Sequence, residues 1–291
     1  MSLRGVRYAP SPTGTLHLGN LRTAWISWRL ARRSGEPWVV RFEDIDGPRV
    51  LPGSQEQQLS DLGALGLVPD EVIVQSQQRR LHFDALLRAV REGHVYPCRC
   101  SRKDVAHNLA SAPHGPEAVY DGRCRTRPAS DFGVETYGWR LRSDDPTQDV
   151  LIARAVRGPD AMPVEESFQP AYHWACAIDD SVGRYSLLVR AWDLAGAARA
   201  QRAIQQWFAP DRSPPAVFHT SLVVQDDGHR LEKRTQGVTL AEWVASGRSP
   251  ASLLRAFQAT FDESLRSFSE EDPYGETARS LSVSRLFEAA R

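Results

Sequence analysis

One histidine lies in a loop whose composition suits the binding of an anion. Residues 9–20 (APSPTGTLHLGN) contain two prolines and two glycines, so they are expected to form neither helix nor strand. A helix that follows such a loop offers backbone N–H groups and the positive end of its dipole. His17 could donate a hydrogen bond to a phosphate oxygen there, or it could only cap the turn. The loop matches neither GxxxxGK[ST] nor GxGxxG, so neither common nucleotide motif applies.

Three of the four cysteines are close together in the sequence. Cys98, Cys100 and Cys124 fall within 27 residues, which favours a metal site over disulfides in a chain with so few cysteines. A structural zinc site needs four ligands, and spacing alone offers His107 or His114 as the fourth. The alternative is three reduced thiols without a metal. Cys176 lies in an apolar stretch and is expected to be a packed core residue.

The elements around the histidine loop predict the start of a parallel α/β sheet. Val6 and Tyr8 alternate with polar or small residues, as in a short strand, and apolar residues from Leu21 onward follow helical spacing. Residues 38–42 (WVVRF) read as the next strand, with Glu43 at its carboxyl end. This order of strand, loop, helix and strand is typical of α/β folds.

Several helix starts are visible further along the chain. Ser54 with Gln57 and Thr239 with Glu242 form capping-box patterns, and Ser249 precedes a proline, as at a helix start. Helices are also predicted for residues 78–92 and 197–208, and strands for residues 137–142, 150–156, 185–189 and 217–224.

The composition excludes several classes of protein. The 291 residues are 41% hydrophobic and 25% charged, as in globular proteins, and no uncharged apolar run is long enough to span a bilayer. The first residues lack a signal-peptide pattern, so we expect a cytoplasmic protein with no membrane partner. The net charge is zero, yet six basic residues gather in one region, so one face can still be basic. They are Arg99, Arg102, Lys103, Arg123, Arg125 and Arg127.

Two stretches resemble the glutamyl and glutaminyl branch of class I aminoacyl-tRNA synthetases, and the first of them resembles the first signature of that class. They are residues 9–20 and residues 40–46 (VRFEDID). In that family the first signature binds ATP, and its histidine stabilises phosphate charge while an adenylate forms. The resemblance thus implies that His17, Gly19 and Asn20 contact ATP, with Asn20 replacing the second histidine of the general signature. It also implies that Arg7, Ser11 and Glu43 contact the amino acid.

Two later stretches resemble the family's second substrate-binding region. They are residues 172–174 (YHW) and 189–194 (VRAWDL). The resemblance implies that Tyr172 and Arg190 hold the side-chain carboxylate of glutamate. A cation in this position would favour glutamate over glutamine, because a neutral amide would leave the cation poorly compensated.

A polar loop, residues 229–234 (HRLEKR), resembles the family's second signature, a basic loop that acts on the phosphates. The resemblance implies that Lys233 stabilises the transition state and that Arg230 replaces the first lysine of the signature. Glu232 stands where a serine is usual. Its negative charge beside a polyphosphate could weaken ATP binding.

The cysteine region also resembles part of this family. Short proteins similar to glutamyl-tRNA synthetases carry Cys-x-Cys followed by Tyr-x-x-x-Cys, and residues 120–124 (YDGRC) fit that second part. The resemblance implies a structural zinc ion with four ligands: Cys98, Cys100, Tyr120 and Cys124.

Only 58 residues follow Lys233, too few for the helical anticodon-binding domain of a full glutamyl-tRNA synthetase. The chain therefore resembles the stand-alone glutamyl-Q tRNA(Asp) synthetases. That family activates L-glutamate with ATP, for which Mg²⁺ is expected, and transfers it to the queuosine base at the wobble position of tRNA(Asp). The partners implied are ATP, L-glutamate and the anticodon stem-loop of that tRNA, bound by a monomer.

Three other interpretations stay open. The chain could be a truncated or divergent glutamyl-tRNA synthetase that charges the 3′ end of tRNA(Glu). It could be a small-molecule nucleotidyltransferase, which shares the fold and the histidine signature but has no need of Glu43, Tyr172 and Arg190. It could also be a catalytically inactive tRNA-binding paralogue, as Glu232 hints.

The resemblance and the element order together predict an α/β fold of the class I synthetase type. A Rossmann-like parallel sheet is expected from residues 1–97 and 170–238, interrupted by a zinc-containing subdomain of the acceptor-binding type at residues 98–169. A helical region is expected at residues 239–291.

Overall fold

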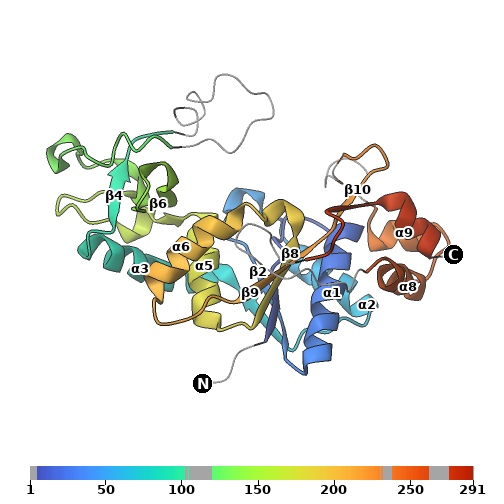
Figure 1. Ribbon diagram of the computed structural model, residues 1–291. Helices are drawn as coiled ribbons and strands as arrows, with labels where there is room; N and C mark the ends of the chain where they lie inside the picture. The colour runs from blue at the N-terminus through green and yellow to red at the C-terminus, as the bar shows by residue number, and fades with distance from the viewer. Residues whose placement is uncertain are drawn as a thin grey trace. The chain divides into compact units, whose positions relative to one another are not determined.

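The computed structural model describes residues 5–101, 104, 120–229, 231, 238–261 and 275–290 (Figure 1). The chain divides into two compact units. The first contains Met1–Ser76, Gly183–Gly196 and Pro215–Arg291, and the second contains Gln77–Val182 and Ala197–Pro214. In the described part of the chain, no helix is both long enough and apolar enough to cross a membrane.

A five-stranded parallel sheet forms the centre of the first unit, in the order β3-β2-β1-β8-β9. The chain first moves outward from β1 to β3 and then returns to the other side of β1 with β8 and β9. The order therefore reverses between β1 and β8, and ligands of open α/β sheets bind beyond the carboxyl ends of the strands at such a point. The strands are β1 (Val6–Tyr8), β2 (Trp38–Phe42), β3 (Glu71–Val74), β8 (Leu187–Ala191) and β9 (Ala216–Thr220).

The helices of the first unit share one apolar cluster with one face of this sheet. Tyr8, Val40 and Phe218 supply the strand side of the cluster, and Trp25 and Trp243 are among the helix residues packed on it. The unit's α-helices are α1 (Leu18–Ser34), α2 (Ser54–Ala64), α7 (Leu240–Ala245), α8 (Pro250–Thr260) and α9 (Val283–Ala289). A small parallel pair, β10 (Leu222–Val224) and β11 (Ser280–Ser282), joins two distant parts of the chain. Short 3₁₀ turns lie at Gly47–Arg49, Gln75–Gln78 and Trp192–Leu194.

An antiparallel sheet forms the centre of the second unit, in the order β4-β5-β6-β7. Phe83 and Leu86 from one helix and Ile204 from another pack with Trp139 and Ile152 of the sheet. The strands are β4 (Val95–Cys98), β5 (Thr136–Leu141), β6 (Val150–Val156) and β7 (Gln169–Pro170). The helices are α3 (Arg79–Arg91), α5 (Tyr172–Gly183) and α6 (Ala197–Phe208), with 3₁₀ turns at Ala129–Asp131, Pro146–Gln148 and Glu165–Ser167.

The predicted α/β class with a parallel sheet is confirmed, but the bounds of the compact units differ from those of the predicted domains. The second unit begins at Gln77 rather than at residue 98, because α3 packs on the antiparallel sheet. It also takes in α6, which follows β8 in the sequence. The C-terminal helices share the core of the first unit instead of forming a unit of their own. The three-part division by domain stays a prediction.

Most elements lie where the sequence places them, with two differences. The stretch 217–224 is two strands rather than one, because the chain breaks at Ser221 between β9 and β10. The capping box predicted at Ser54 is wrong. Gly53 is the N-cap of α2, and its positive φ of 75° suits glycine. The hydroxyl of Ser54 instead accepts a hydrogen bond from the N–H of Gly14. The capping box of Thr239 and Glu242 is present at α7, and Ser249 caps α8.

Candidate active site and metal centre

Arg7 and Arg190 lie in the two strands that flank the reversal point of the parallel sheet. Arg7 of β1 is paired with Leu188 of β8, and Arg190 follows two residues later. Because side chains alternate along a strand, the two arginines belong to the same face. Arg7 is 4% exposed and Arg190 is 5% exposed. Two buried guanidinium groups at this position suit the binding of carboxylate groups, which arginine can hold through two parallel hydrogen bonds.

Glu43 continues the same face at the end of β2. Arg7 is paired with Val39, Arg41 follows two residues later and Glu43 two after that. The ladder extends to this point, since the backbone N–H of Glu43 donates to the carbonyl of Pro10 at 3.0 Å. This face is opposite to the one that packs on α1, to which Tyr8 and Val40 belong. Arg7, Glu43 and Arg190 are therefore brought to one face at the carboxyl edge of the sheet.

Arg41 is a partner of Glu43 that the sequence analysis missed. Its Nη2 donates to Oε1 of Glu43 at 2.9 Å, and both side chains are buried. A partner of this kind offsets the hydration that a carboxyl group loses on burial. The alternation Arg-Phe-Glu was the available signal, because residues two apart in a strand share a face.

The loop before α1 is held by α2. The hydroxyl of Ser54 accepts from the N–H of Gly14 at 2.9 Å and donates to the carbonyl of Gly14 at 2.8 Å. Gln58 donates through Nε2 to the carbonyls of Gly14 and Ser11, at 2.7 Å and 3.2 Å. Ser11 itself is exposed. No motif assigned Ser54 or Gln58 to this loop, since Ser54 was predicted only to cap α2, so the folded contacts alone identify them as its anchors.

His17 is the N-cap of α1. Its Nδ1 accepts from the N–H groups of Gly19 at 3.1 Å and Asn20 at 3.4 Å. A nitrogen that accepts these bonds carries no proton, so Nε2 is the protonated nitrogen that can donate to a ligand. Gly19 is required by the close approach of this ring, since a Cβ there would lie 2.9 Å from Cε1 of His17.

The expectation of free N–H groups at the start of α1 is wrong. The N–H of Leu18 donates to the carbonyl of Val238 at 2.9 Å, and those of Gly19 and Asn20 bind His17. The two interpretations of His17 are therefore not exclusive. Nδ1 caps the helix, and donation to a phosphate, which would use Nε2–H, stays a prediction.

The remaining predicted substrate residues fall in different parts of the chain. Tyr172 is the first residue of α5 in the second unit, where its ring contacts that of His173 at a centroid distance of 5.3 Å. Arg230, Glu232 and Lys233 lie outside the described residues. The chain that follows them is tied to the start of α1, since Thr239 forms a β-bridge with His17.

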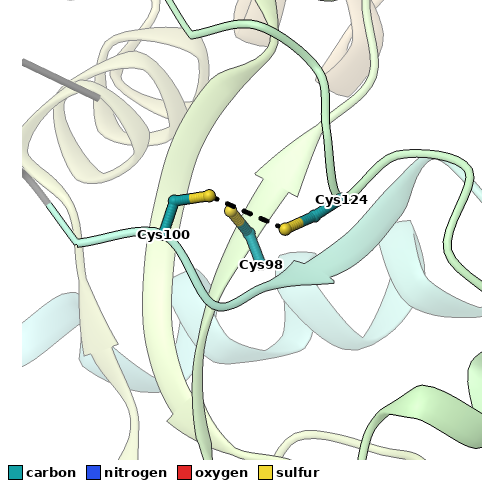
Figure 2. A group of neighbouring side chains, drawn as sticks. All are labelled: Cys98, Cys100 and Cys124. Atoms are coloured by element: carbon teal, nitrogen blue, oxygen red, sulfur yellow. Dashed lines mark hydrogen bonds between the residues drawn. The ribbon is translucent and has the colours of Figure 1, made fainter. Parts of the chain in front are cut away.

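The three clustered cysteines come together in the second unit, at the end of β4 and in the turn that follows Tyr120 (Figure 2). Their Sγ atoms all lie within 4.8 Å of one another, and those of Cys100 and Cys124 are 3.7 Å apart. A tetrahedral zinc ion with bonds of about 2.3 Å separates its sulfur ligands by about 3.8 Å. The spacing therefore fits a metal site, and all three cysteines are free of disulfides.

Tyr120 also reaches this cluster. Its hydroxyl oxygen lies 3.6 Å from Sγ of Cys98 and accepts from the N–H of Cys124 at 3.0 Å. Arg140 donates through Nε to Sγ of Cys98 at 3.3 Å. The predicted set of three cysteines and one tyrosine is thus adjacent in space. The two histidines that spacing alone offered, His107 and His114, lie outside the described residues.

The thiols of this cluster differ in how readily they ionise. Burial raises the pKa of Cys124, but hydrogen bonds from the backbone of Arg99 and from Tyr120 outweigh burial, so this pKa lies below its usual value. Burial, with the neighbouring Cys98, raises the pKa of Cys100 to about 12. Burial likewise raises the pKa of Tyr120 above its usual value. Three thiols at these distances repel one another as thiolates, and a cation placed between them removes that cost. The donor chemistry of the described cluster therefore fits a zinc ion.

The basic residues near the cysteines differ in how strongly their charges are compensated. Arg123 pairs with Asp121 at 2.6 Å, and Arg125 pairs with Asp149 at 3.0 Å. Arg99 lies over the rings of Phe132 and Tyr137. Arg127 is exposed, while Arg102 and Lys103 lie outside the described residues.

Comparison with known proteins supports one family. Residues 5–268 match the model for the catalytic domain of class I tRNA synthetases (E and Q). A glutamyl-Q tRNA(Asp) synthetase of Nocardia farcinica is 38% identical over 258 residues, which cover 85% of this chain and 81% of that protein. One of Leptothrix cholodnii is 34% identical over 288 residues and 93% of both chains. A glutamate-tRNA synthetase structure from Elizabethkingia anophelis shares the fold, with a TM-score of 0.72 and 20% identity over 99% of this chain and 70% of that one.

These matches agree with the motifs that the sequence analysis identified and with the parallel sheet on which they lie. The chain belongs to the glutamyl-Q tRNA(Asp) synthetases, within the glutamyl and glutaminyl branch of the class I tRNA synthetases.

Proposed function

We propose that this chain activates L-glutamate with ATP and transfers it to the queuosine base at the wobble position of tRNA(Asp). One observation carries the proposal. Arg7, Glu43 and Arg190 are buried on one face at the carboxyl edge of the parallel sheet, around its reversal point. An amino acid with a second carboxylate has three charges, and this edge offers one acid and two arginines to meet them.

Glutamate binding follows from these charges. Glu43, which accepts a hydrogen bond from Arg41, holds the α-ammonium group together with Ser11. Arg190 holds the side-chain carboxylate, a role that the resemblance also assigns to Tyr172. Arg7 stabilises the α-carboxylate of the amino acid. Glutamine would place an amide against Arg190 and bind more weakly, since the guanidinium would lose its charged partner.

The first chemical step forms glutamyl adenylate. An oxygen of the α-carboxylate attacks the α-phosphorus of ATP, the bond to the β-phosphate oxygen breaks and pyrophosphate leaves. His17 donates through Nε2–H to a phosphate oxygen, while Gly19 and Asn20 line the ATP site. Lys233 and Arg230 neutralise the negative charge that develops. The step is thus accelerated by electrostatic stabilisation rather than by proton transfer.

The second step transfers the glutamyl group. A hydroxyl of the cyclopentene ring of queuosine attacks the carbonyl carbon of the mixed anhydride and loses its proton. An ester forms, and AMP leaves with the electrons of the broken bond. Activation needs no tRNA, so the two steps can be measured separately.

Two metal ions accompany this proposal. Mg²⁺ supplies charge neutralisation on the ATP phosphates. A zinc ion held by Cys98, Cys100, Tyr120 and Cys124 has a structural role, since no predicted substrate residue other than Tyr172 belongs to that unit. We place the protein in the cytoplasm and expect a monomer.

Two assays test the proposed function. Glutamate-dependent ATP–pyrophosphate exchange should proceed without tRNA, and glutamine should support it far less well. Labelled glutamate should then enter tRNA(Asp) that contains queuosine but not tRNA(Asp) that lacks it. Exchange without transfer to queuosine, combined with charging of tRNA(Glu), would instead identify a divergent glutamyl-tRNA synthetase. Absence of exchange would favour a tRNA-binding paralogue.

A further inference from the structure

We propose that His219 positions the guanidinium of Arg190 and thereby determines how strongly the protein selects a side-chain carboxylate. The inference rests on the proposed function for its substrate, and the contacts that carry it lie within the first unit.

The two side chains meet across neighbouring strands. Arg190 of β8 and His219 of β9 are directly paired in the sheet, so their side chains share a face. The Nε–H group of Arg190 donates to Nε2 of His219 at 3.2 Å, and both residues are buried. A guanidinium can only donate, so Nε2 of His219 must carry a lone pair, and its ring is neutral with the proton on Nδ1.

The hydrogen bond to His219 determines which edge of the Arg190 guanidinium can bind a carboxylate. A guanidinium can hold a carboxylate through Nε and one Nη or through both Nη atoms. With Nε–H directed at His219, the two parallel bonds to a substrate carboxylate fall to the Nη1–Nη2 edge. A guanidinium that is already oriented loses less freedom on binding, which strengthens the complex.

The ring of His219 is itself fixed. It is fully buried and stacked on Trp192, with ring centroids 5.2 Å apart and an angle of 26° between the planes. Arg279 lies over the same tryptophan at 5.2 Å. The imidazole therefore has little freedom to turn its nitrogen away from Arg190.

A segment close to the C-terminus clamps the backbone of His219. Gly275 forms a β-bridge with it, and the N–H of Glu276 donates to its carbonyl at 2.9 Å. A Cβ at Gly275 would lie 2.2 Å from that carbonyl oxygen, so only glycine fits. The carboxylate of Glu276 binds both Nη atoms of Arg22 at 2.5 and 2.6 Å and accepts from the N–H of Ser221 at 2.7 Å. The clamp is thus anchored in α1.

The kinetic test compares two substitutions of His219. His219→Phe keeps a ring against Trp192 but removes the acceptor, and we expect the KM for glutamate in pyrophosphate exchange to rise about 10- to 100-fold. The KM for ATP and kcat should change little. His219→Gln supplies an amide oxygen as acceptor and should restore most of the affinity. His94→Phe, at an exposed site in the second unit, is the matched control.

The structural test uses nitrogen-15 NMR of the intact protein. We expect His219 to carry its proton on Nδ1, and the Nε–H signal of Arg190, assigned by its loss in Arg190→Lys, to exchange slowly with water. In His219→Phe this exchange should accelerate, while in His219→Gln it should stay slow.

The two tests distinguish a failure of the positioning role of His219 from a failure of the proposed function. A proton on Nε2 of His219, or an Arg190 signal that His219→Phe leaves unchanged, would overturn the positioning role. So would equal losses in kcat and in affinity for ATP, which indicate a general structural defect. A wild-type protein without glutamate-dependent exchange would overturn the proposed function and the selectivity, and NMR would still decide whether His219 orients Arg190.

Discussion

At the scale of single residues, the molecule couples each chemically important group to a neighbour that fixes its state. Nδ1 of His17 accepts the hydrogen bonds that cap α1, so the proton of the neutral ring lies on Nε2. Arg41 donates a hydrogen bond to the buried carboxylate of Glu43 and holds it in place. The sequence motifs identify His17 and Glu43, but they show neither which nitrogen of His17 binds the backbone of Gly19 nor that Arg41 binds Glu43, because such contacts depend on ring orientation and strand register. Both contacts had a local signal: the position of His17 before a helix, and the spacing of two between Arg41 and Glu43 in a strand.

Gly19 offers a test of the His17 geometry. Gly19→Ala places a methyl group against Cε1 and Nδ1 of His17, so the ring must move and Nε2–H leaves its position. We expect kcat of pyrophosphate exchange to fall about 10- to 1000-fold, as for loss of one transition-state donor. Gly63→Ala is the matched control, because its added methyl meets nothing within 4 Å in α2. Equal activity of the two variants would contradict the role of His17.

At the scale of elements, periodicity located most helices and strands, since helical and strand spacing are local properties. The pairing order β3-β2-β1-β8-β9 was not predictable, because it depends on contacts between residues far apart in the sequence. Nor was the placing of α3 and the C-terminal helices predictable, because it depends on which distant residues their apolar faces meet. Ser54 shows how a local rule fails when a stronger contact competes for the same hydroxyl. It binds Gly14 instead of capping α2.

The contact between Ser54 and Gly14 predicts that α2 positions the substrate loop. Ser54→Ala removes the hydroxyl that accepts from the N–H of Gly14 and donates to its carbonyl, both in a half-buried position. We expect a loss of about 1–3 kcal/mol in the free energy of unfolding. The KM values for glutamate and ATP should rise together. Ser60→Ala on the exposed side of α2 should change stability by less than about 0.5 kcal/mol. Chemical denaturation and pyrophosphate-exchange kinetics of both variants measure these effects. Equal stability and equal KM values in the two variants would contradict a role of α2 in positioning the loop.

At the scale of the whole molecule, the charged residues predicted to bind the amino acid and the residues predicted to bind the metal lie in different units. The acid and arginines that suit the amino acid lie in the first unit, and the cysteine cluster lies in the second. Loss of the metal should therefore lower the stability of the second unit more than it lowers the rate of pyrophosphate exchange. Metal analysis of protein purified without chelators should find about one zinc ion per chain. Cys100→Ser should lower the zinc content and the melting temperature. A full complement of zinc in that variant would contradict the site.

The same division predicts that charge in the second unit acts on the transfer step alone. Arg123 and Arg125 have acidic partners, whereas Arg127 is exposed. Arg127 lies next to the cysteine cluster, because its backbone N–H donates to the carbonyl of Cys124. A positive charge in this position can displace counterions from tRNA phosphates. Arg127→Ala should weaken tRNA binding and lower the slope of log affinity against log salt concentration by about one, which filter binding at several salt concentrations measures. Pyrophosphate exchange should be unchanged. Arg255→Ala, an equal loss of exposed charge on α8, should leave both steps intact. If Arg255→Ala weakened tRNA binding as much as Arg127→Ala, overall charge and not a local surface would direct the tRNA.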